Sequence, residues 1–157
     1  MTYLHSRRIV FRDLKPDNVG FDGNGVLKLF DFGLAAGLPR DGALHQRSGT
    51  PRYMAPEVGL CRGYGTGADV YSFGVLLWEL CAWTRPLPHI STLDEFEREV
   101  FVGGRRPAIK GHWPTTTKDL IRSCWSHDAN ERPTMLDIKC SLSLEIFNIH
   151  GEEYAPQ

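Results

Sequence analysis

Apolar residues gather most densely between positions 69 and 83 of this 157-residue chain. They fall on every side of a helix and comprise Val70, Phe73, Val75, Leu76, Leu77, Trp78, Leu80 and Cys81. A helix that is apolar all round is buried in a protein core. We therefore expect a central buried helix from Asp69 to Trp83. Glu79 interrupts this run, which is also too short to span a bilayer.

Three further segments carry the pattern of amphipathic helices. Each begins with Ser or Thr followed three residues later by Asp, an N-terminal capping pattern, and continues with apolar residues on one face. The segments are Ser91 and Asp94 with Leu93, Phe96 and Val100; Thr116 and Asp119 with Leu120, Ile121 and Cys124; and Thr134 and Asp137 with Met135, Ile138 and Leu142. These stripes predict helices that pack on the core rather than binding surfaces.

Two short apolar runs near the start predict a β-hairpin. Residues 19–21 and 26–30 flank the turn sequence Asp22-Gly23-Asn24-Gly25. The pattern as a whole favours one mainly α domain over residues 1–148, a helical bundle around a buried central helix with a small β-hairpin. We expect the polar tail, 149–157, to be unstructured.

Composition narrows the functional classes. A net charge of −1 gives no field that would attract nucleic acid or a membrane. The four cysteines are scattered without metal-ligand spacing and indicate reduced thiols in an intracellular, cytoplasmic protein. They are Cys61, Cys81, Cys124 and Cys140. The first eight residues contain no apolar stretch typical of a signal peptide.

Three short motifs occur in a fixed order and carry the candidate chemistry. They are Val10-Phe11-Arg12-Asp13-Leu14-Lys15-Pro16-Asp17-Asn18, Asp31-Phe32-Gly33 and Ala55-Pro56-Glu57. The predicted hairpin would bring Asn18, at one end, close to Asp31, at the other. These polar residues could instead be ordinary turn residues, because Asn and Asp are common in turns. Three motifs in order disfavour that alternative.

With these motifs the chain resembles the C-terminal lobe of a eukaryotic protein kinase, with Phe11 in place of the usual His. The resemblance implies transfer of the γ-phosphoryl group of ATP to a protein hydroxyl. It implies that Asp13 receives the hydroxyl proton and that Lys15 lies near the transferring group. It also implies that Asn18 and Asp31 hold Mg²⁺, an ion that prefers oxygen ligands.

The stretch from 31 to 57 would then be the activation segment, ending in a substrate-docking sequence at 49–57. By resemblance, Thr50 contacts Asp13 and Lys15, and both Thr50 and the pair Lys15-Pro16 favour serine and threonine substrates. Ser48 is a candidate phosphorylation site whose phosphate could pair with Arg12. An ordinary solvated serine is the favoured alternative for Ser48.

The resemblance also implies structural roles for several residues. Asp69 would hold the backbone of the catalytic loop, although an Asp at a helix N-terminus is favoured by the helix dipole in any case. Glu57 and Arg132 would form a buried ion pair, and Phe11 would pack beside Phe32. The sequence from 124 to 134 resembles the end of the C-terminal lobe in kinases of the tyrosine-kinase-like group. Kinases of that group combine this ending with catalytic loops of the serine/threonine type.

Two departures from the family pattern matter for function. Gly20 stands where the family has a bulky apolar residue under the adenine ring, which predicts a thinner floor of that pocket. No glycine-rich loop and no Val-Ala-Ile-Lys-type lysine precede Asp13, so we expect the N-terminal lobe to be missing from this sequence.

Three interpretations remain open. The first is a serine/threonine kinase that uses ATP and Mg²⁺, with this chain as a truncated catalytic part acting on protein substrates. The second is a non-catalytic lobe that binds a missing N-terminal lobe or another kinase as a scaffold or competitor. The third is an unrelated helical binding domain with chance motifs, which would show no magnesium-dependent nucleotide binding.

Overall fold

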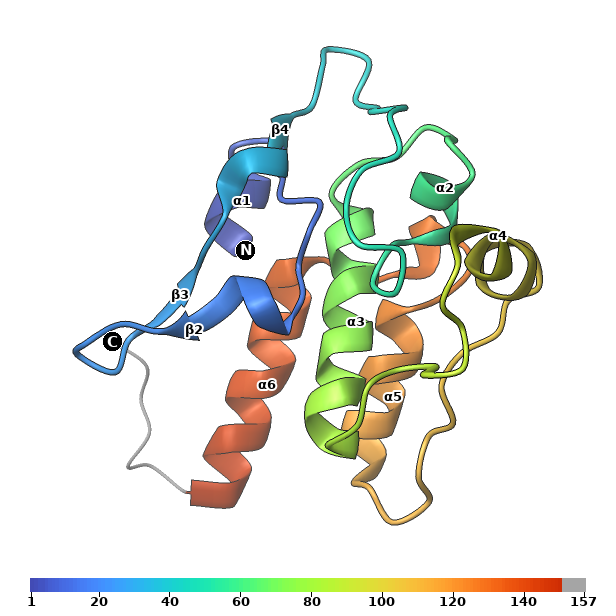
Figure 1. Cartoon of the computed structure of the whole chain (residues 1–157). Helices are drawn as coiled ribbons and strands as arrows, with labels where there is room; N and C mark the ends of the chain where they lie inside the picture. The colour runs from blue at the N-terminus through green and yellow to red at the C-terminus, as the bar shows by residue number, and fades with distance from the viewer. Residues whose placement is uncertain (151–157) are drawn as a thin grey trace.

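The molecule is rich in helices and carries two small β-ribbons (Figure 1). The computed structural model describes the backbone of residues 1–150 and the side chains of residues 1–147. The helices are α1 (Thr2–Ser6), α2 (Pro56–Gly59), α3 (Gly67–Ala82), α4 (Leu93–Phe96), α5 (Thr115–Cys124) and α6 (Met135–His150), with the π-helix η3 (Glu97–Val102). Short 3-10 turns are η1 (Pro16–Asn18), η2 (Phe32–Leu34) and η4 (Ala129–Glu131). The strands are β1 (Ile9–Val10), β2 (Val19–Phe21), β3 (Leu27–Leu29) and β4 (Ala36–Gly37).

The predicted hairpin is formed by β2 and β3. The strands are antiparallel, with Gly20 opposite Lys28. In the turn, the carboxylate of Asp22 accepts hydrogen bonds from the amides of Asn24 (2.9 Å) and Val26 (3.0 Å). Gly25 has a φ of +75°, a conformation that glycine adopts without steric cost. A second ribbon, β1 with β4, was not predicted from the sequence.

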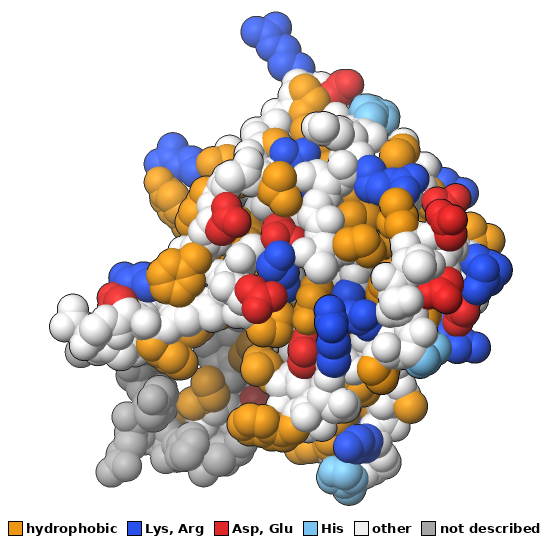
Figure 2. All heavy atoms as spheres, viewed as in Figure 1, with side chains coloured by type: hydrophobic (Ala, Val, Ile, Leu, Met, Phe, Trp, Pro, Cys, Tyr) orange, Lys and Arg blue, Asp and Glu red, His pale blue; other side chains and the backbone are white. Residues whose placement is uncertain are grey.

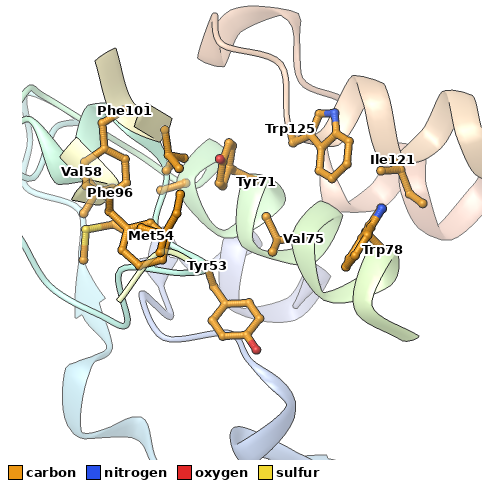
Figure 3. Packing of buried hydrophobic residues seen from close by; sticks show 14 of the residues in the cluster. Tyr53, Met54, Val58, Tyr71, Val75, Trp78, Phe96, Phe101, Ile121 and Trp125 are labelled. Carbon is orange, nitrogen blue, oxygen red and sulfur yellow. The ribbon is translucent and has the colours of Figure 1, made fainter. Parts of the chain in front are cut away.

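Helix α3 runs through the middle of the molecule, with the ribbons and α1 on one side of it and α2, α4 and α5 on the other (Figure 1). This confirms the predicted buried central helix. Figure 3 shows Tyr71, Val75 and Trp78 of α3 in the core, with Ile121 and Trp125 packed beside them. The burial is incomplete at the C-terminal end of α3, where Leu80 is 60% exposed.

The capping prediction was wrong for two of the three other helices. Helix α4 is capped by Thr92 and not Ser91: the amide of Glu95 donates to Thr92 Oγ1 (3.3 Å), and Glu95 in turn accepts from the Thr92 amide (3.0 Å). The longer side chain of Glu95 completes a reciprocal pair that Asp94 was expected to make. Helix α5 begins after Pro114 without a side-chain cap, and Thr116 donates to Glu145 of α6 instead (2.9 Å).

The third capping prediction is confirmed at the start of α6. The Thr134 hydroxyl donates to the Asp137 carboxylate (2.6 Å), and the Asp137 amide donates back to Thr134 Oγ1 (3.2 Å). Helix α6 continues to His150, so residues 149 and 150 of the predicted tail are helical. The rest of that tail, 151–157, lies outside the described residues. Within the part of the chain that is described, no helix has the length and apolarity needed to cross a membrane.

Candidate active site

The carboxylate of Asp13 lies at the centre of the candidate site and has several hydrogen-bond donors around it. Asp13 is only 7% exposed to solvent. Oδ1 accepts from the amide (2.9 Å) and the hydroxyl (2.7 Å) of Thr50. Oδ2 lies 2.9 Å from Lys15 Nζ and accepts from Asn18 Nδ2 at 3.0 Å. Four donors from three residues therefore fix the orientation of this one side chain.

These donors also set the charge of Asp13. Burial alone raises the pKa of a carboxyl group, because it disfavours the charged form. Here the hydrogen bonds from Lys15, Thr50 and Asn18 and the charge of Lys15 outweigh burial, so the pKa of Asp13 is lowered. Asp13 is accordingly an anion at neutral pH, oriented to accept a hydrogen bond from a hydroxyl group.

Lys15 provides the cation of the site. Its ammonium group donates to Thr50 Oγ1 (2.9 Å) and lies at the same distance from Asp13 Oδ2. The structure thus brings Asp13, Lys15 and Thr50 together, although Thr50 lies 37 residues after Asp13. A positive charge next to this carboxylate can stabilise an anionic group that lies beside it.

The hairpin brings Asn18 and Asp31 to the same end of its two strands. The amide of Phe30 donates to the carbonyl of Asn18 (2.9 Å), which extends the ladder by one residue and places Asp31 next to it. Asp31 has a φ of +54°, and its Oδ1 accepts from the Gly33 amide (3.1 Å). Asn18 Nδ2 donates two hydrogen bonds to Asp13, one to its backbone carbonyl and one to its carboxylate.

This pair of side chains fits a magnesium site with few protein ligands. Because the nitrogen of the Asn18 amide group is committed to Asp13, its oxygen is the atom left for a metal, and Asp31 supplies a second hard oxygen. Within the described residues, no group of three or more His, Cys, Asp and Glu side chains is placed to hold a metal. Mg²⁺ commonly uses one or two carboxylates and completes its shell with water and phosphate oxygens.

Asp69, at the start of α3, holds the backbone of the loop that carries Asp13. Its side chain is fully buried and accepts from the amides of Phe11 and Arg12, both at 2.8 Å. Arg12 has a φ of +70°, an uncommon conformation for a residue with a side chain. The two bonds to the carboxylate stabilise this part of the loop. His5 Nε2 contacts the same carboxylate at 2.9 Å, a contact that no sequence pattern indicated.

Phe11 packs beside Phe32, as the resemblance implies. The ring of Phe11 is fully buried, and its centroid lies 5.2 Å from that of Phe32 with the planes at 78°. Edge-to-face pairs of this kind are favourable beyond the area they bury. The ring therefore takes the packing role, while the hydrogen bonds that a histidine could make are absent at this position.

The segment from 31 to 57 returns to the catalytic loop at Gly49. A Cβ atom at this position would lie 2.1 Å from the Arg12 carbonyl oxygen, and φ is +106°, so only glycine fits. Ser48, the preceding residue, lines a small cavity together with Arg12 and Tyr64. Arg12 itself donates to the carbonyl of Leu34. Ser48 and Arg12 are therefore neighbours, but phosphorylation of Ser48 stays a prediction.

Glu57 and Arg132 form a bidentate ion pair 75 residues apart in sequence. The two guanidinium nitrogens donate to the two carboxylate oxygens at 2.6 and 2.9 Å, and the Arg132 side chain is fully buried. Arg132 also donates to the carbonyls of Ser126 (2.9 Å) and Gly67 (3.0 Å). The pair ties the end of the 31–57 segment to the start of α3 and to the loop before α6.

The thinner pocket floor expected at Gly20 stays a prediction, although a neighbouring ring fills the space beside this glycine. A Cβ atom at Gly20 would lie 2.9 Å from Cε2 of Phe30, so an aromatic ring occupies the space that a side chain at position 20 would take. The sequence pattern indicated Phe30 only as a strand residue.

The face of the molecule seen in Figure 2 carries both signs of charge. Figure 2 shows Lys and Arg side chains interspersed with Asp and Glu over the face seen in Figure 1, with hydrophobic side chains between them. This mixture agrees with the net charge of −1. No large field of one sign is visible on this face that would select a strongly charged macromolecule.

Comparison with known proteins identifies the family. Residues 1–142 match the family model described as the protein kinase domain. This match covers most of the chain, so the chain belongs to the protein kinase family. A dual specificity protein kinase of Dictyostelium discoideum, shkB, is 38% identical over 154 residues, which is 96% of this chain and 24% of that protein.

Two plant relatives are similar to the same extent. The serine/threonine-protein kinase STY46 of Arabidopsis thaliana is 37% identical over 153 residues, covering 98% of this chain and 26% of that protein. The serine/threonine-protein kinase STY17 of the same plant is 36% identical over 153 residues, with 98% and 27% covered. The chain therefore spans about a quarter of the length of these relatives.

Proposed function

We propose that this chain is the C-terminal lobe of a protein serine/threonine kinase of the tyrosine-kinase-like group, which transfers the γ-phosphoryl group of ATP to protein hydroxyls with Mg²⁺. The observation that carries the proposal is the cluster in which Asp13 contacts Lys15, Asn18 and Thr50. ATP would lie between this lobe and an N-terminal lobe from the same or another polypeptide.

Asp13 orients the substrate hydroxyl and takes its proton. Because the pKa of Asp13 is lowered, the carboxylate is a weak base before transfer. It accepts a hydrogen bond from the hydroxyl first. The proton then moves to Asp13 as the new P–O bond forms and the bond between the γ-phosphorus and the β–γ bridging oxygen of ATP breaks, which releases ADP. The Thr50 hydroxyl donates to Asp13 Oδ1 at 2.7 Å, which shows that a hydroxyl group can reach this oxygen.

Lys15 and the hairpin end balance the charge of the phosphoryl group. The ammonium of Lys15 lies 2.9 Å from Asp13 Oδ2, so it stands beside the point of attack. When bound, Mg²⁺ neutralises phosphate charge, and Asn18 and Asp31 are the residues that would hold it. Asp69 keeps the catalytic loop in place through the amides of Phe11 and Arg12.

The preference for serine and threonine rests on two features. Thr50 and Lys15 contact each other directly at 2.9 Å beside Asp13. Of the relatives, STY46 and STY17 are named serine/threonine kinases, whereas shkB is named a dual specificity kinase. We propose that the substrates are proteins and that the enzyme acts in the cytoplasm.

The direct test is phosphotransfer by the chain joined to the N-terminal lobe of a related kinase. We expect Mg²⁺-dependent transfer from ATP to peptides that differ only in carrying Ser, Thr or Tyr, with Tyr the poorest acceptor. Asp13→Asn should lower kcat by about 10²- to 10⁴-fold, the range of general acid–base catalysis.

Asp17→Asn is the matched control, because Asp17 lies in the same loop outside the Asp13 cluster. It should leave the rate within about twofold if only the hydrogen-bonded cluster matters. Full activity in Asp13→Asn would refute the role given to Asp13, and transfer to the Tyr peptide alone would refute the serine/threonine preference.

A non-catalytic interaction module is the second candidate. The observation that favours it is an apolar groove of about 650 Å³ beside Met1, between the hairpin and α3. Its lining includes Phe21, Leu27 and Leu80, which are 72%, 59% and 60% exposed. Absence of phosphotransfer in the joined protein, together with binding of an intact kinase to the chain, would favour this candidate.

A further inference from the structure

A groove lies where α1 and η4 meet the first residues of α3 and α6. Its volume is about 500 Å³. Pockets that hold small organic molecules typically measure about 300–1,000 Å³. The wall combines the apolar side chains of Val70, Met135 and Leu136 with hydroxyl-bearing residues such as Thr2 and Ser6. None of the described residues that line this groove is an Asp or a Glu.

His5 connects the wall of this groove to the catalytic loop. Its side chain is 12% exposed, and its Nε2 lies 2.9 Å from Oδ2 of Asp69. The same carboxylate accepts from the amides of Phe11 and Arg12, both at 2.8 Å. A molecule that contacts the His5 ring is thus separated only by the Asp69 carboxylate from the backbone of the loop that carries Asp13.

The contact with Asp69 determines which nitrogen of the His5 ring carries the hydrogen. An ionised carboxylate only accepts hydrogen bonds, so Nε2 is the donor, and Nδ1 of the neutral ring is an acceptor. Within residues 1–147, Nδ1 makes no hydrogen bond, and it is not among the buried polar atoms that lack a partner. It is therefore accessible from the groove that the ring lines. A ligand that pairs with the neutral ring must bring an N–H or O–H group.

The charges next to the groove favour a neutral ligand. Arg132 lies in the wall, but its side chain is fully buried and paired with Glu57 at 2.6 Å. Asp69, behind His5, is also fully buried and already accepts from three donors. Neither charge is left to pair with a charged ligand. A neutral molecule would therefore lose the least solvation energy on entering the groove.

We propose that this groove is a regulatory binding site for a neutral, mostly apolar small molecule with an N–H or O–H donor. The donor bonds to Nδ1 of His5, and the contact acts on the catalytic loop through Asp69. The apolar wall buries the body of the ligand, and the ring nitrogen orients it, as in other small-molecule sites. The lining residues are separate from the cluster around Asp13, so the site does not depend on the proposed phosphotransfer function.

Two probes of the same shape test the hydrogen bond. Indole carries an N–H group, and benzofuran has an oxygen atom at the same place in an otherwise matching pair of rings. Each is titrated into the full chain by NMR at mildly alkaline pH, which favours neutral imidazole rings. We expect indole to bind about three- to tenfold more tightly than benzofuran, the usual worth of one hydrogen bond. Equal affinities would refute the contact with His5, and binding of neither probe would refute the site.

Backbone amide resonances report the effect on the catalytic loop. Indole should shift the resonances of Phe11 and Arg12, whose amides donate to Asp69. The amide of Asn24 is a matched reporter, because it also donates to a carboxylate, that of Asp22 at 2.9 Å, but lies in the hairpin turn. Its resonance should not move. Binding of indole without a shift at Phe11 and Arg12 would refute the link to the loop.

Two leucines of α6 test the location of the site. Leu136 lines the groove and is 55% exposed, whereas Leu144 lies outside it and is 64% exposed. Both side chains are largely in water, so alanine at either position should leave the fold intact. Leu136→Ala should weaken both probes about threefold, because apolar contact is lost, and Leu144→Ala should bind them as the wild type does. Equal affinities of the two variants would refute the proposed location.

A third variant removes the acceptor itself. His5→Phe keeps an aromatic ring in the wall but has no ring nitrogen, so indole should lose its advantage over benzofuran. His127→Phe is the matched control, because His127 is exposed and lies outside the groove. It should keep the full difference between the probes. An unchanged difference in His5→Phe would overturn the proposal. The two probes on the unaltered chain and the leucine pair decide the question even if His5→Phe does not fold.

Discussion

Neutralising Glu57 should destabilise the fold strongly, because it leaves the buried Arg132 guanidinium without its counter-charge. The Arg132 side chain is fully buried and that of Glu57 is 13% exposed, so water cannot replace the lost partner. Glu57→Gln keeps the size of the side chain but turns an amide NH₂ group toward one of the guanidinium nitrogens. We expect a loss of about 3–5 kcal/mol of unfolding free energy, the usual cost of breaking a buried pair.

The geometry of the pair explains why Glu57→Gln should lower the free energy of unfolding more than the loss of an exposed charge would. Both oxygens of Glu57 are engaged, at 2.6 and 2.9 Å, so the pair is bidentate. Arg132 also donates to the carbonyls of Ser126 and Gly67, which fix the guanidinium in place. The group therefore cannot turn toward solvent when its partner is neutralised.

Urea denaturation is the assay. With a slope of about 2 kcal/mol/M for a domain of this size, the midpoint should fall by about 2 M in Glu57→Gln. Asp119→Asn is the matched control: Asp119 pairs with Arg122 at 3.0 Å, but the two side chains are 63% and 57% exposed. Such a surface pair is worth less than about 0.5 kcal/mol, so its midpoint should hardly move.

A double variant isolates the pair itself. In an Arg132→Met background there is no buried cation left to compensate, so Glu57→Gln should cost much less than it does in the wild type. Equal midpoint shifts for Glu57→Gln and Asp119→Asn, or an undiminished cost of Glu57→Gln in the Arg132→Met background, would refute the reasoning.

Two further predictions concern titratable groups away from the site. Hydrogen bonds from the amides of Ser91 and Thr92 lower the pKa of Glu95 from 4.5 to about 2. Its stabilising contribution should thus be present above pH 4.5 and lost as the pH falls toward 2, and a carboxyl NMR titration with a midpoint near 4.5 would contradict this. Burial and the Glu79 hydrogen bond raise the pKa of Tyr53. Tyr53→Phe should cost about 1–2 kcal/mol by urea denaturation, and no loss would show that the 2.6 Å bond is not stabilising.

Local sequence patterns were sufficient to predict the helices and turns that are formed by contacts between residues close together in the chain. The apolar run around Val75 predicted α3, the turn at Asp22 predicted the hairpin, and the Thr134–Asp137 pair predicted the start of α6. The capping prediction was wrong at α4 because four neighbouring residues can all cap a helix: Ser91, Thr92, Asp94 and Glu95. Which pair forms depends on where the helix axis lies against the core, and a sequence pattern does not contain that information.

The motifs were sufficient to identify the chemically competent residues. Residue type, order and spacing select Asp13, Asn18 and Asp31 as candidates, and the hairpin places the latter two at the same end of its strands. No sequence pattern indicated His5, whose ring contacts Asp69 across 64 positions. None indicated the ring of Phe30 over Gly20 either, because that contact depends on strand pairing and on the rotamer of one side chain.

The sequence by itself therefore determined the family, the central helix and the identity of the candidate catalytic residues, since these depend on residue type and short spacing. Only the tertiary structure decided their environment. The charge state of Asp13 follows from donors that include Thr50, 37 positions away, and the catalytic loop is held by Asp69, 57 positions from Arg12. Such contacts form only when distant segments pack together, because their energies depend on distance in space and not on distance along the chain.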